Sequence, residues 1–155
     1  MPNNPFNKTI FASLTYVIVS ILATLIGVRE NLIPHVLNIT SDKTIKGGLL
    51  DKGTAISPPI QMLILVGILI ILLLFKWRGR KYTALGLSII GFLSFLGSIF
   101  EHLTLRVFRP ISFDLMLALL ILMVSISAIA MSYFGFIEFS IERRKFNTPH
   151  ESIEL

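Results

Sequence analysis

Charged and uncharged positions are sharply segregated along this chain. Four runs without any Asp, Glu, Lys, Arg or His cover residues 9–28, 53–75, 82–100 and 115–137. A helix rises about 1.5 Å per residue, so about 20 apolar residues cross a hydrocarbon core of about 30 Å. Lipid offers no partner to an exposed backbone N–H or C=O, so each run should form a helix. The pattern predicts transmembrane helices at about 9–28, 58–76, 82–104 and 112–137.

These four helices predict an all-α fold, an antiparallel four-helix transmembrane bundle formed by one integral membrane domain over residues 1–155. A soluble helical bundle is disfavoured, because its helices would carry charges opposite the apolar stripe. We expect a long outer loop at 29–57, an inner basic turn at 76–81 and a polar tail at 146–155. Proline suits the first turn of a helix, so Ser57 is expected to cap the second helix and Pro58 to begin it.

Basic residues indicate the orientation of the bundle. The side that holds both termini carries eight of them, four in the six-residue turn at 76–81. The other side carries six, diluted among five acidic residues. Because basic residues favour the cytoplasmic side, we expect a multi-pass protein of the cell membrane with both termini in the cytoplasm. The first run is longer than a signal-peptide core, so we expect it to be retained.

Small residues on one helical face predict where the helices pack, since close backbone approach drives helix association in lipid. The first, third and fourth runs each have such a face, and the second run has only Gly67. We therefore expect the first, third and fourth helices to share the tight interface and the second to face more lipid. The faces are Ser13, Tyr16, Ser20, Ala23 and Gly27; Ala84, Ser88, Gly91, Ser94 and Ser98; and Ser125, Ala128, Ser132 and Gly135.

The composition limits the chemistry available. With no cysteine among 155 residues, disulfides and thiolate metal sites are excluded. No ionisable Asp, Glu, Lys, Arg or His lies within the four runs, which argues against a proton-coupled transporter. We expect no cofactor and no metal site. The net charge of +5 lies beside membrane spans, so lipid headgroups are better partners than nucleic acid.

A candidate ligand site lies at the outer mouth of the third helix. If that helix continues past Phe100, then His102, Arg106 and Arg109 share one face beside Glu101, and they could bind an anion. An ordinary polar boundary with solvated charges explains the same residues.

Two groups of residues on the inner side are also candidates. Lys76, Arg78, Arg80 and Lys81 could bind anionic lipid headgroups, although an orientation signal is the simpler explanation. Glu138 and Glu142 lie one helical turn apart beside several cations, so we expect weak interfacial salt bridges rather than acid–base chemistry.

Three functions remain open. The first is a non-enzymatic protein that associates with lipid or with another membrane protein (or a second copy of itself), as a subunit, modulator or immunity-type factor. The alternative is an oligomeric transporter of small solutes or lipids, suggested by the serines on the small-residue faces. A weaker alternative is a membrane enzyme that uses the outer polar site.

Overall fold

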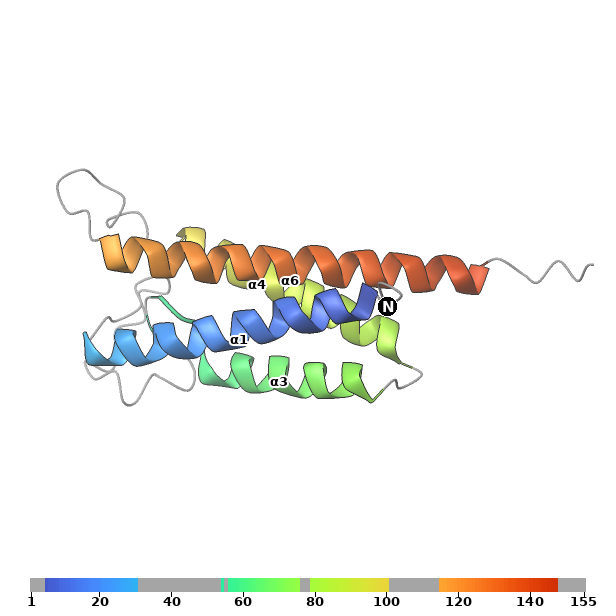
Figure 1. Ribbon diagram of the computed structural model, residues 1–155, viewed down its shortest axis with the longest axis horizontal. Coiled ribbons are helices and arrows are strands. Elements are labelled where there is room, and N and C mark those ends of the chain that lie inside the picture. The colour runs from blue at the N-terminus through green and yellow to red at the C-terminus, as the bar shows by residue number, and fades with distance from the viewer. Residues whose placement is uncertain (1–4, 31–53, 55, 76–78, 101–114, 148–155) are drawn as a thin grey trace, which may run out of the picture.

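The computed structural model describes residues 5–30, 54, 56–75, 79–100 and 115–147 (Figure 1). These residues form four α-helices: α1 (Pro5–Arg29), α3 (Ile60–Leu74), α4 (Arg80–Phe100) and α6 (Leu115–Asn147). The helices pack as a bundle, which confirms the predicted fold. The predicted outer loop lies almost wholly outside the described residues, as do residues 76–78, 101–114 and the end of the tail.

The helices form a ring in which each packs against the next, in the order α1, α3, α4, α6. Their alternating directions bring the start of α1 and the end of α6 to one end of the bundle (Figure 1). We call this the terminal end; α4 also begins there, at Arg80. In this ring α1 and α4 lie across the bundle from each other.

Within the described residues, three helices are long and apolar enough to cross a membrane, namely α1, α4 and α6. Large hydrophobic side chains are exposed along all four helices, including Ile18, Ile64, Phe92 and Met123. Lipid is the environment in which such surfaces are stable. The chain is therefore a small, helical, multi-pass membrane protein.

Two helices are longer than predicted. α1 begins at Pro5 rather than near residue 9. α6 spans 33 residues, or about 50 Å, and continues past the charge-free run to Asn147. Since about 20 residues are enough to cross the hydrocarbon core, α6 is longer than one crossing requires.

The second apolar helix is shorter than predicted. α3 has 15 residues, about 22 Å, and begins at Ile60 rather than at residue 58. Pro59 precedes it with an extended backbone, φ −55° and ψ 145°, and no side chain caps the helix. The predicted capping role of Ser57 is therefore wrong.

Instead of starting the helix, Ser57 pairs with Thr54. The Ser57 N–H donates to the Thr54 carbonyl at 3.3 Å, and the Thr54 N–H donates to the Ser57 carbonyl at 3.1 Å. Thr54, Ile56 and Ser57 are all buried. Non-helical backbone is tolerated near a membrane when protein covers it, and here it is covered.

The predicted small-residue faces of the third and fourth helices do form the tightest contact. A Cβ atom at Gly91 would lie 2.6 Å from the Ala128 carbonyl oxygen, and one at Gly135 would lie 2.6 Å from the Ala84 carbonyl oxygen. α6 also packs extensively on α1, whereas α3 has less extensive contacts with its neighbours. α6 is thus the helix that both α1 and α4 contact, whereas α1 and α4 lie across the ring from each other, so the three helices do not share one common interface as expected. That α3 faces more lipid stays a prediction.

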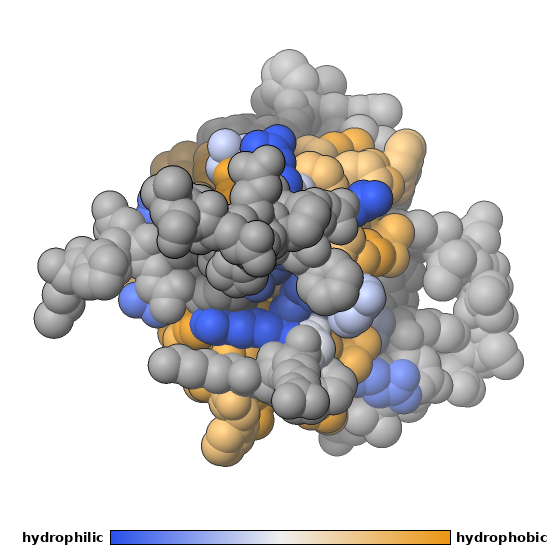
Figure 2. Space-filling model, turned by 90° about the vertical axis from the view of Figure 1, so that its right-hand side faces the viewer, coloured by the Kyte–Doolittle hydropathy of each residue, from blue (hydrophilic) through white to orange (hydrophobic). Residues whose placement is uncertain are grey.

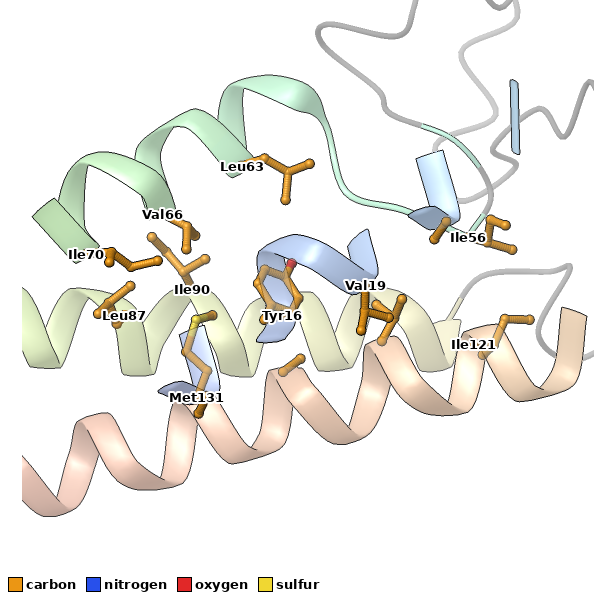
Figure 3. Packing of buried hydrophobic residues seen from close by; sticks show 14 of the residues in the cluster. Tyr16, Val19, Ile56, Leu63, Val66, Ile70, Leu87, Ile90, Ile121 and Met131 are labelled. Atoms are coloured by element: carbon orange, nitrogen blue, oxygen red, sulfur yellow. The ribbon is translucent and has the colours of Figure 1, made fainter. Parts of the chain in front are cut away.

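Apolar side chains fill the centre of the bundle (Figure 3). α3 contributes one buried face, at positions repeating every three or four residues: Leu63, Val66, Ile70 and Leu73. This spacing places all four side chains on one side of the helix. The other helices add Tyr16, Leu87 and Met131, which are completely buried.

Candidate functional site

The predicted outer anion site lies outside the described residues. Glu101, His102, Arg106 and Arg109 all follow the last described residue of α4, and the site stays a prediction. Lys76 and Arg78 of the inner basic group also lie outside.

The other two residues of that basic group, Arg80 and Lys81, lie in the first turn of α4. The Lys81 ammonium lies 5.1 Å from the centre of the Tyr82 ring, within the range of a cation–π interaction. Arg80 is half-buried and interacts electrostatically with Glu138 and Glu142 of α6. The structure thus joins Arg80 to the two carboxylates, which the sequence only placed on the same side. Lipid binding by these residues remains a prediction.

Glu138 is the most unusual polar residue of the bundle. Its side chain is 1% exposed, and neither carboxylate oxygen has a hydrogen-bond partner. The expected weak interfacial salt bridge is therefore wrong for Glu138. The groups that act on its carboxylate are the Thr9 hydroxyl, Arg80 and Glu142.

Local packing explains why Glu138 is buried. Gly135 lies one turn earlier on α6, and a Cβ atom there would come within 3.2 Å of Ser88 as well as meeting Ala84. α4 and α6 therefore approach closely just before Glu138, and the same face of α6 turns into the bundle at residue 138. Thr9, near the start of α1, is among the groups that act on the buried carboxylate.

A line of hydroxyl groups continues from Glu138 along the inner face of α1. Thr9, Ser13 and Ser20 are completely buried, and none of their hydroxyls has a hydrogen-bond partner. Tyr16 lies on the same face, since the spacings of three and four residues keep one side of the helix. The sequence predicted a face with Ser13, Tyr16 and Ser20, but it predicted neither Thr9 on this face nor the unbonded hydroxyls.

The middle of the line is bonded across the bundle. The Tyr16 hydroxyl donates to Ser94 Oγ of α4 at 2.8 Å, and the Ser94 hydroxyl lies 3.8 Å from Met62 Sδ of α3. Three helices are thereby joined by polar groups inside the apolar core. Such bonds stabilise helix association in membranes by about 0.6 kcal/mol on average.

The opposite end of the bundle has its own polar cluster. The Thr24 hydroxyl bonds the Ser57 hydroxyl and the Ser20 carbonyl, the latter at 2.8 Å. Thr54 lies against Gly27, where a Cβ atom would meet Thr54 Oγ1 at 2.6 Å. This cluster attaches the non-helical segment before α3 to the last turns of α1.

Hydrophilic residues also gather at the terminal end (Figure 2). Figure 2 looks onto it and shows hydrophilic residues gathered there, with hydrophobic residues around the edge. In the described part of the chain, no group of three His, Asp or Glu residues could hold a metal ion. What the arrangement offers is a buried carboxylate, a neighbouring guanidinium and a line of hydroxyls.

Comparisons with protein families, curated proteins and solved structures find no match for this chain.

Proposed function

We propose that this chain is a non-enzymatic membrane protein that acts by associating with another membrane protein or a second copy of itself, as a subunit, modulator or immunity-type factor. The observation that supports this best is the filled centre of the bundle. Tyr16, Val66, Leu87 and Met131 come from all four helices and are each 0% exposed, and they lie together in the core (Figure 3). A solute crossing the bundle would have to displace this layer.

With the centre of the bundle filled, the outer surface is where we expect the protein to bind a partner. Every helix exposes large apolar side chains, and α3 exposes the most relative to its length. Lipid tails and the helices of a partner are both suited to such a surface. Association through these faces requires no catalytic group and no interior path.

Photo-crosslinking in native membranes tests the association. A photoreactive amino acid placed at Ile18, Ile64, Phe92 or Met123, one outward position per helix, should yield a defined protein adduct from one or two adjacent helices. The matched control is the same residue at Leu87, which is buried. Adducts with lipid alone from all four outward positions would contradict the proposal.

The proposed orientation places the terminal end in the cytoplasm of a cell membrane. Lys8, Arg80, Arg143 and Arg144 lie at that end, and positive charge favours the cytoplasmic side. In intact cells, a cysteine at Gly79 should resist a membrane-impermeant thiol reagent until the cells are opened. Labelling of that cysteine from outside would invert the orientation.

Anionic lipid is proposed as a further partner at this end, through Arg80 and Lys81. Binding to vesicles that contain an anionic lipid should weaken with added salt, because exposed charges are screened. Arg80 is partly engaged by the carboxylates of α6, so we expect the substitution K81Q to weaken lipid binding. Equal binding to anionic and zwitterionic vesicles would remove this part of the proposal.

A transporter is the second candidate, and one observation favours it. Ser13 and Ser20 are buried with unbonded hydroxyls, and a hydrated path would supply their missing partners. Single cysteines at Ser20 and Ser94 distinguish the two functions in a chain that has no other cysteine. Protection from aqueous thiol reagents is expected for association, and rapid labelling of both would favour transport. The enzyme alternative depends on the outer polar residues and stays a prediction from the sequence.

A further inference from the structure

The buried carboxylate of Glu138 is a feature that the proposed association does not explain. It lies immediately after the charge-free run of α6 and faces the first turns of α1 and α4. Buried groups of this kind normally have a hydrogen-bond partner, yet both oxygens lack one, as does the Thr9 hydroxyl that acts on them. Thr9 is itself 0% exposed.

One cation and one other carboxylate act on Glu138. Arg80 is the cation that acts on Glu138, and the same guanidinium also acts on Glu142. The Glu142 carboxylate in turn repels a negative charge at Glu138. Among the side chains that the structure describes, the other charged groups at this end are Lys8 of α1, Lys81 of α4, which lies against Tyr82, and Arg143 and Arg144 of α6. Lys8, Arg143 and Arg144 are exposed.

Burying an ionised carboxylate without a hydrogen bond is so costly that such groups usually become neutral instead. A proton is the smallest ligand that achieves this. It removes the negative charge, and it turns the carboxylate into a hydroxyl donor with a remaining carbonyl acceptor. The Thr9 hydroxyl, which can both donate and accept, is then a matching partner.

We propose that Glu138 and Thr9 form an internal proton-binding site at the terminal end of the bundle, with the proton on the Glu138 carboxyl and Thr9 as its hydrogen-bond partner. The proton comes from water at the terminal end and returns to it. The proposal is independent of the association proposed above.

Infrared spectroscopy of the full chain tests the proposal directly. The protein is reconstituted into ether-linked zwitterionic lipid, because ester carbonyls would hide the band of a protonated carboxyl group. At neutral pH the wild-type protein should show this carboxylic acid C=O band, and the band should disappear in E138Q. The substitution E142Q is the matched control one turn away and should leave the band in place.

The role of Thr9 has its own signature. In the variant T9V, which keeps the side-chain shape but removes the hydroxyl, the band should persist with a shifted frequency. A band that does not move in T9V would remove Thr9 from the site.

The wild-type spectrum decides the proposal even if E138Q fails to fold. Absence of any carboxylic acid band at neutral pH would mean that Glu138 is ionised and held by Arg80, which overturns the proposal. A band that survives unchanged in folded E138Q would overturn it as well, because the proton would then belong to another residue.

Discussion

Adding a single methyl group at Gly91 should separate the two most closely packed helices. In the substitution G91A, the new Cβ would lie 2.6 Å from the Ala128 carbonyl oxygen, 2.9 Å from the Ser132 nitrogen and 3.2 Å from the Ser132 Cα. All three are backbone atoms, so no side chain can rotate away. Ordinary contact begins at 3.4 Å, so α4 and α6 must move apart locally by about 0.8 Å.

The expected cost follows from that displacement. Overpacking of a tight contact typically costs about 1–3 kcal/mol, and in lipid the loss of close helix approach is not offset by a hydrophobic driving force. We expect G91A to lower the free energy of unfolding by about 2 kcal/mol, within that range. Since 1.4 kcal/mol is tenfold in an equilibrium constant, the unfolding constant should rise by more than ten times.

The measurement is equilibrium unfolding in mixed detergent micelles, followed by circular dichroism. G67A is the matched control, because a Cβ at Gly67 meets nothing within 4 Å. G135A should behave like G91A, since its Cβ would meet the Ala84 carbonyl oxygen at 2.6 Å. If G91A unfolds at the same denaturant concentration as G67A, the reasoning from close backbone contact is refuted.

Two further predictions concern the interior polar contacts and the attachment of the segment before α3. The substitution G27A should destabilise the protein, because its Cβ would lie 2.6 Å from Thr54 Oγ1 and 2.7 Å from Thr54 Cβ. Adding T54G to G27A removes those atoms and should restore stability. A double variant as unstable as G27A alone would contradict this explanation. The substitution Y16F removes the 2.8 Å hydrogen bond to Ser94 and should lower the free energy of unfolding by about 0.5–1.5 kcal/mol. In a double-mutant cycle with S94A, the two losses of stability should not add. Fully additive losses would show that the bond contributes nothing.

The fold could be predicted because its strongest signal is local. A run of about 20 uncharged residues must form a helix in lipid wherever it lies in the chain. The spacing of small residues also predicted the α4–α6 contact correctly, since Gly91 and Gly135 allow an approach that larger side chains prevent. Both inferences need only the sequence around each residue.

The start of α3 could not be predicted in the same way. Pro58 and Pro59 are equally compatible with the first turn of a helix and with an extended segment. The choice depends on Thr54 and Ser57, which pair with each other while the Ser57 hydroxyl bonds Thr24 on another helix. Ser57 therefore bonds Thr54 and Thr24 instead of capping α3.

Glu138 shows the limit of the sequence most clearly. By sequence it is an acid just past a membrane span, beside Arg143 and Arg144, and such acids usually lie at the interface in weak salt bridges. The sequence by itself determined that the chain forms apolar helices, since lipid makes each helix satisfy its own backbone. Only the tertiary structure decided that this carboxylate is buried and unbonded, because burial depends on how Gly135 brings α6 against α4 and on where α1 begins.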